Sequence, residues 1–137
     1  MRRILAAAAA ALLAASCGAS RTAPERKGRT IVITDTVAAQ GGTDTVRFGR
    51  MHSGEIGRLP LWIENASERA TAILSYQRSC GCTTLEFDAE PLAPGEARRA
   101  SLTLDTRGER GWMLKTLDLK LAGAERPLRI FVEAEVE

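Results

Sequence analysis

Two cysteines separated by one glycine, Cys80 and Cys82, are the residues of this sequence whose types and spacing could most readily do chemistry. Side chains two residues apart on an extended backbone point to the same side, and Gly81 would let the chain bend between them. Both sulfur atoms can therefore face one surface. The pair can be interpreted as a disulfide, as part of a metal site, or as two small side chains in a turn whose thiols are incidental.

The disulfide is favoured by an oxidising compartment, which the N-terminal sequence described below implies. A bridge across one intervening residue closes a very small ring, in which the preferred Cα separation and torsion are hard to satisfy together. We expect such a bond to be labile and redox-active. It should add little stability, because so short a loop removes little entropy from the unfolded chain.

The metal site would use the two thiolates of Cys80 and Cys82, which suit monovalent copper or zinc. A closed zinc site normally needs four ligands. The further candidates are His52, which is the only histidine, and the thioethers of Met51 and Met113. Nothing in the sequence brings them near the cysteines. We expect a surface position for His52 and a core position for Met113, and no bound cofactor.

Other catalytic arrangements lack the residues they need. A Ser-His-acid triad would have to use His52, which has no nucleophile motif around it, and no glycine-rich phosphate loop is present. Paired acids such as Glu133 and Glu135 fall on the expected solvent face of the last strand, where they would protect an edge or aid solubility. The sequence therefore predicts a protein that is not an enzyme.

The first residues predict an export signal over 1–16. Arg2 and Arg3 precede an apolar, Ala-rich run over 4–13. This run is well short of the roughly 20 residues that a membrane-spanning helix needs. Small residues then lead into Cys17, a pattern that resembles the lipobox of bacterial lipoproteins. We expect the thiol of Cys17 to carry the lipid that holds the mature chain at a membrane.

Charge limits the partners of the mature chain. Without Arg2 and Arg3, the 19 basic residues become 17, which equals the 17 acidic residues, so the formal charge is about zero. A neutral domain argues against nucleic acid, which demands a clustered basic surface. It also argues against strong attraction to anionic lipid, so the lipid on Cys17 must supply the membrane binding. Residues 17–29 are polar and lack apolar periodicity, which predicts a flexible tether.

Beyond residue 30, short apolar runs alternate with period two between turn residues such as Pro94-Gly95, which predicts strands. The faces expected to be buried are Ala100, Leu102 and Leu104, then Leu117, Leu119 and Leu121, and finally Leu128, Ile130, Val132, Ala134 and Val136.

These strands predict an all-β sandwich of about seven strands in one domain over 44–137. Residues 30–43 are interpreted as an extra N-terminal strand, over 30–37, followed by a linker. That strand could pair at an edge or belong to the tether. The stretch over 71–76 is apolar on both faces, which predicts a central strand.

Three segments resemble one known family: Val46-Arg47-Phe48-Gly49, Ser79-Cys80-Gly81-Cys82-Thr83, and Pro91-Leu92-Ala93-Pro94-Gly95-Glu96. The family is the bacterial domain-of-unknown-function family fifteen seventy-three, and the resemblance covers roughly 44–136. It implies an immunoglobulin-like sandwich and an envelope protein or lipoprotein. It implies no activity, and fold alone does not supply one.

We therefore expect a lipid-anchored binding or adaptor module of the bacterial cell envelope, on the periplasmic or outer-membrane face. Its partner would be an envelope protein or glycan bound through sheet edges or end loops. The alternative is a redox or copper-handling accessory that uses Cys80 and Cys82, with His52 as a speculative third ligand.

Overall fold

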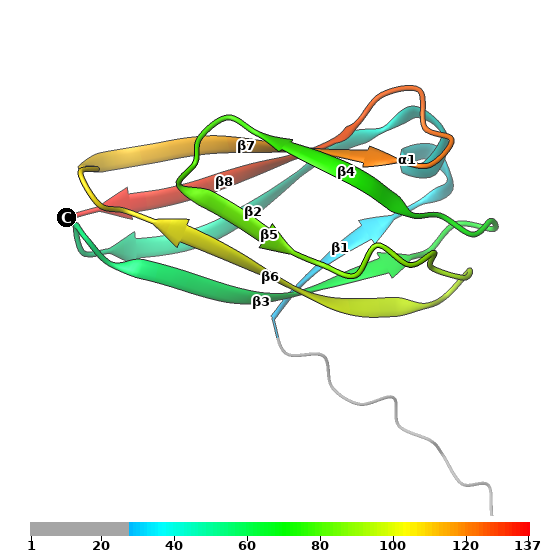
Figure 1. Cartoon of the computed structure of the whole chain (residues 1–137), viewed down its shortest axis with the longest axis horizontal. Helices are drawn as coiled ribbons and strands as arrows, with labels where there is room; N and C mark the ends of the chain where they lie inside the picture. Colours follow the sequence, from blue (N-terminus) through cyan, green and yellow to red (C-terminus); the bar gives the residue numbers. More distant parts are fainter. Residues whose placement is uncertain (1–27) are drawn as a thin grey trace, which may run out of the picture.

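The computed structural model describes residues 28–137, which form eight strands and one short helix (Figure 1). The predicted signal, Cys17 and nearly all of the predicted tether lie outside the described residues. Arg29, the last residue assigned to the tether, is the first residue of β1. The elements are β1 (Arg29–Ile33), α1 (Asp35–Gln40), β2 (Gly42–Met51), β3 (Ile56–Asn65), β4 (Ile73–Arg78), β5 (Thr83–Glu86), β6 (Ala97–Asp105), β7 (Gly111–Leu121) and β8 (Leu128–Val136).

The strands form two sheets that face each other, as Figure 1 shows. One sheet has the order β1-β3-β6-β5 and the other has the order β2-β8-β7-β4. β1 runs parallel to β3, and β2 runs parallel to β8, whereas the other neighbouring strands are antiparallel. The predicted all-β sandwich is confirmed, and the seven strands after α1 match the number expected from the sequence.

The core lies between the sheets and consists of the alternating apolar residues predicted from the sequence. Every second residue of β8, from Leu128 to Val136, is buried, as are Leu102 and Leu104 on β6 and Leu117 and Leu119 on β7. A strand exposes its side chains to opposite faces in turn, so one face of each sheet packs and the other meets solvent.

The strand expected over 30–37 ends earlier, at Ile33, and α1 follows it. The side chain of Thr34 accepts a hydrogen bond from the amide of Val37 at 3.3 Å, which caps a helix start. This cap outweighs the strand preference of Thr and Val in so short a segment. The remaining strand pairs with β3 at the edge of the first sheet, so it is part of the sandwich.

The prediction of a central strand over 71–76 was wrong. β4 lies at the edge of its sheet and pairs with β7 alone. The apolar character of this stretch has another cause, because Thr71 bridges to Leu92 in the connection between β5 and β6, and Ala72 and Ile73 are buried in the same region. Leu74, which gave the run its second apolar face, is exposed at a register shift.

A buried asparagine at the end of β3 ties three segments together. The side-chain amide of Asn65 donates to the carbonyl oxygens of Arg69 and Leu92, at 2.8 and 2.9 Å. Its side-chain oxygen accepts from the amide and the hydroxyl of Ser67, at 3.0 and 2.6 Å. All four side-chain hydrogen-bonding contacts of Asn65 are thus made inside the protein, and they hold the end of β3 to the segments of Arg69 and Leu92.

Candidate functional site

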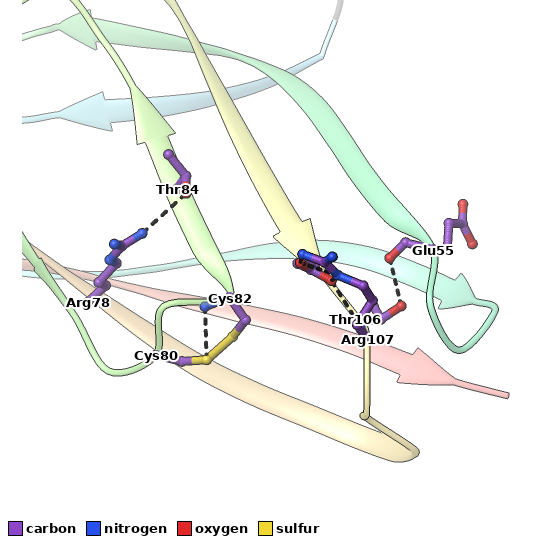
Figure 2. Close-up of polar contacts among 8 residues, drawn as sticks. Glu55, Arg78, Cys80, Cys82, Thr84, Thr106 and Arg107 are labelled. Atoms are coloured by element: carbon purple, nitrogen blue, oxygen red, sulfur yellow. Dashed lines mark hydrogen bonds and ion pairs between the residues drawn. A yellow bond between two sulfur atoms is a disulfide. The ribbon is translucent and has the colours of Figure 1, made fainter.

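Cys80 and Cys82 are joined by a disulfide in the turn between β4 and β5 (Figure 2). Their Cα atoms are 5.2 Å apart, and the amide of Cys82 donates to the sulfur of Cys80 at 3.0 Å. Both cysteines are half-buried, and Gly81 between them is exposed. The turn carries the chain from the edge of one sheet to the edge of the other, so the disulfide lies where the two layers meet.

Hydrogen bonds fix this turn on both sheets. The amide of Ser79 donates to the carbonyl of Thr116 on β7 at 3.0 Å, and the Ser79 hydroxyl accepts from the Thr116 amide at 2.9 Å. On the other sheet, the amide of Asp105 donates to the carbonyl of Cys82 at 2.8 Å. Arg78 also reaches across to the carbonyl of Thr83, at 2.8 Å. The disulfide is therefore a rigidly placed surface feature.

Gly81 has a different role from the one that the sequence suggested. Its φ is not positive, and a Cβ atom added there would meet no other atom within 4 Å. The turn therefore does not require glycine at this position. Gly41, at the end of α1, does require it, because its φ is 79° and an added Cβ would lie 2.4 Å from the carbonyl oxygen of Arg126.

The structure separates the other residues that were considered as metal ligands. His52 is exposed in the turn between β2 and β3, whereas Met51 and Met113 are buried in the core. Within residues 28–137, no three His, Cys, Asp or Glu side chains come close enough to hold a metal ion together. His52 is thus not brought together with Cys80 and Cys82 as a ligand set.

Next to the disulfide, the turns that end β2 and β6 are linked through Thr106, which is fully buried. Its hydroxyl lies within donating distance of the carbonyl oxygen of His52, at 3.0 Å, and of that of Glu55, at 2.7 Å. Figure 2 shows the contact with Glu55. Beside it, the guanidinium of Arg107 hydrogen-bonds to Asp105 and lowers the pKa of that carboxyl. The backbone hydrogen bond from Asp105 to Cys82 joins these turns to the one that carries the disulfide.

The two paired acids lie on β8, on the outer face of its sheet. Glu133 accepts a hydrogen bond from Arg47 of β2 at 3.0 Å. Glu135 is exposed and lies opposite Trp112 in the register of β7 and β8. The Glu133 carboxylate therefore takes part in a surface ion pair between neighbouring strands.

The structure shows one further feature that the sequence reasoning missed, which is an unpaired edge on β7. β4 pairs with β7 from Leu121 to Leu117, and Ser79 adds a contact at Thr116. The chain then turns away at the disulfide. The segment Gly111–Lys115 pairs with β8 on one side and, within the part of the chain that the structure describes, with no strand on the other. We call this segment the open edge of β7.

Two large apolar side chains stand on the open edge of β7. Trp112 and Leu114 are 64% and 42% exposed, whereas Met113 between them is buried. The backbone groups of Thr116 face the β4 side, so those of Leu114 and Trp112, two and four residues earlier, face the same open side. A run of three apolar residues, Trp112-Met113-Leu114, in an otherwise alternating strand is the sequence signal for the two exposed apolar side chains, whereas the missing strand neighbour has no local sequence signal.

No helix of the described residues is long and apolar enough to span a membrane.

Two solved structures resemble this fold. A protein of unknown function from Porphyromonas gingivalis W83 is 18% identical, with a TM-score of 0.56, over 72% of this chain and 48% of that chain. The chain thus spans about half the length of that protein. A PapD-like domain of human CEP192 is 13% identical, with a TM-score of 0.51, over 68% of this chain and 80% of that chain. At these identities the likeness shows the fold alone. No curated protein matches the chain.

A family model described as "Protein of unknown function (DUF1573)" matches residues 39–136. The match covers β2 to β8 and both cysteines of the disulfide, and it confirms the resemblance seen in the sequence. The chain therefore belongs to the DUF1573 family, with an immunoglobulin-like sandwich as its fold.

Proposed function

We propose that this chain is a lipid-anchored, non-enzymatic binding module of a bacterial cell envelope. In this proposal the lipid is attached to Cys17, and the polar segment that follows holds the sandwich away from the membrane. The partner is an envelope protein that adds an extended strand to the open edge of β7. One observation carries the proposal, namely that Trp112 and Leu114 are exposed beside backbone groups that have no strand partner among residues 28–137.

The chemistry of such an edge favours strand addition. Unpaired N–H and C=O groups along a strand offer hydrogen bonds to any extended segment that lies beside them. Exposed apolar side chains on the same strand add contact area and select which side chains the added strand carries. A glycan would need polar and aromatic groups together in a hollow, whereas this edge is apolar and linear, so a protein strand fits it better.

The four edge strands of the two sheets are less suited to this role. β5 has four residues, and short edge strands resist pairing. β2 and β4 carry register shifts, which interrupt a regular ladder. Arg29 of β1 forms an ion pair with Asp44 of β2, which links the two sheets along that side of the sandwich. The open edge of β7 has five residues without a register shift.

The proposal is tested by placing a photo-crosslinking amino acid at position 114 of the full-length chain in its own bacterium. Discrete crosslinked products containing an envelope protein are expected. The matched control carries the crosslinker at Val32 on the edge strand β1, since Val32 is 40% exposed and Leu114 is 42% exposed. Products that form equally from both positions, or from neither, would overturn the proposal.

The alternative function is a redox or copper-handling accessory, and the Cys80–Cys82 disulfide in a surface turn favours it. In this role the pair would accept electrons from a partner dithiol, or would hold monovalent copper as two thiolates after reduction. Thiol titration with and without reductant, together with elemental analysis of the purified protein, separates the two functions. Thiols that neither exchange nor bind metal would remove the alternative.

A further inference from the structure

The open edge of β7 sets strict requirements for the strand that pairs with it. The backbone N–H and C=O groups of Trp112 and Leu114 point away from β8, toward the open side of β7. Those of Gly111, Met113 and Lys115 point toward β8. An antiparallel partner strand must therefore present its own outward-facing residues opposite Trp112 and Leu114. It must also end near Lys115, because Ser79 already occupies the next position, at Thr116.

We infer that the strand added here is the open edge of β7 in a second copy of this chain, related by a two-fold axis. This inference rests on the proposed strand addition and names its partner. The edge is self-complementary. An antiparallel pairing centred on Met113 places Trp112 opposite Leu114 of the second copy, and Leu114 opposite Trp112 of the second copy. In this register the backbone N–H and C=O groups of Trp112 face those of Leu114 in the second copy. Each such pair of residues can exchange two hydrogen bonds.

The side chains fit the same register. Trp112 lies directly across from Leu114 of the second copy, and aromatic and aliphatic residues facing each other stabilise antiparallel pairs. Both residues are exposed in the single chain, and in the pair each would contact the other across the two strands. These contacts would remove part of the exposed apolar surface from water.

The charges near the edge also permit this pairing. Lys115 is the one charged residue between Gly111 and Lys115, and it forms an ion pair with Glu109 at 3.7 Å in its own chain. In the paired register, Lys115 faces Gly111 of the second copy, so no like charges oppose each other. Gly111 has a φ of 77° and begins the strand directly after a turn, so the second chain departs before it reaches Ser79.

The pairing covers five residues per strand, which is small for a stable interface between proteins in solution. Confinement of two lipid-anchored copies to one membrane raises their effective concentration and strengthens such a contact. We therefore expect the pair to form on the membrane at normal levels of the protein, and to dissociate when the protein is extracted and diluted.

The test uses two differently tagged full-length copies expressed together, one with Trp112→Cys and the other with Leu114→Cys. Residues in a hydrogen-bonded pair have Cα atoms about 5.5 Å apart, within the range that a disulfide bridges. We expect a disulfide-linked pair of the two tagged chains under mild oxidation. The control combines one copy carrying Trp112→Cys with one carrying Val32→Cys. We expect no disulfide-linked pair of tagged chains from this combination.

Each result has one meaning. A linked pair of Trp112→Cys and Leu114→Cys that is absent from the control supports the inference. Absence of the linked pair, together with a different envelope protein captured by the photo-crosslinker at position 114, overturns the second copy as partner and leaves the proposed strand addition standing. Absence of both the linked pair and any photo-crosslinked protein overturns both. Equal linkage in the control would show random collision in the membrane and would overturn the inference.

A second measurement tests the same pairing without relying on the alignment of two introduced cysteines. Lysine at both 112 and 114 in one copy, and glutamate at both in the other, places like charges opposite each other in either homodimer and opposite charges together in the mixed pair. We expect the mixture to form amine-to-carboxyl crosslinks between positions 112 and 114 of the two copies, and each variant alone to form no lysine-to-lysine or carboxyl-to-carboxyl crosslink across the edge. Failure of the mixture to form these crosslinks, with both variants folded, would overturn the inference.

Discussion

Ser79 and Thr116 exchange two hydrogen bonds, one from the Ser79 amide to the Thr116 carbonyl at 3.0 Å and one from the Thr116 amide to the Ser79 hydroxyl at 2.9 Å. This pair is the last contact between the β4 segment and β7. It therefore marks where the paired part of β7 ends and its open edge begins, one residue before the disulfide turn.

Ser79→Ala should destabilise the domain because it leaves the Thr116 amide without its partner. The expected loss is about 1 kcal/mol in the free energy of unfolding. Urea denaturation of the full-length protein measures it. Ser75→Ala, at an exposed serine of β4, is the matched control and should have little effect. Equal losses in both variants would show that the Ser79 hydroxyl does not hold the turn.

Asn65→Ala should be the more damaging change. It removes two donated and two accepted hydrogen bonds at a fully buried position, and it leaves the carbonyl oxygens of Arg69 and Leu92 without these donors. We expect a loss of about 3 kcal/mol in the free energy of unfolding. Gln77→Ala, at an exposed residue of β4, serves as the control. A cost no larger than that of Gln77→Ala would contradict the role assigned to Asn65.

Alanine substitutions at Gly41 and Gly81 should have different effects on stability. Gly81→Ala should leave the Cys80–Cys82 disulfide intact and change stability by less than about 1 kcal/mol, because no left-handed φ or close contact is involved. Gly41→Ala should be strongly destabilising, since an added Cβ would collide with backbone. Mass spectrometry of the disulfide and thermal melting check both. A severe effect at Gly81 would contradict the geometry of the turn.

Acid should destabilise the fold through carboxylates that are bound to arginine. A hydrogen bond from Arg129 lowers the pKa of Asp118, and one from Arg107 lowers the pKa of Asp105. Their contribution is fully present above the unfolded pKa, which is about 3.9, and is lost as pH falls through the lower folded pKa. Melting temperature measured from pH 7 downward should fall in that range. Asp118→Asn should make the decrease in melting temperature with falling pH less steep. An unchanged pH profile in this variant would contradict a stabilising role for the ionised Asp118.

The lipid anchor has its own test, because Cys17 lies outside the described residues. Cells labelled with a fatty acid should incorporate the label into this chain, and Cys17→Ser should abolish both the label and membrane fractionation. Cys82→Ser should keep the label, since that thiol has no part in anchoring. A wild-type protein that is unlabelled and released from membranes would contradict the anchor.

The alternation of apolar and polar residues along single strands was enough to predict most of the fold. The buried faces of β6, β7 and β8 follow directly from it, because a strand must turn every second side chain to the same side whatever its neighbours are. The DUF1573 family was likewise recognisable from short motifs, including the one around Cys80 and Cys82. At α1, the strand propensity of the local sequence did not decide the structure. The Thr34 side chain caps the first turn of a helix there.

The position of a strand within its sheet, in contrast, depended on residues far away in the chain. The sequence around Ile73 could not show that β4 lies at an edge, and the sequence around Trp112 could not show that β4 stops short of it. Strand neighbours are set by long-range pairing and by where a connecting turn leaves the sheet. The sequence by itself determined the strands, their buried faces and the pair of cysteines. The tertiary structure alone decided which backbone groups remain unpaired, because each depends on where a distant strand ends.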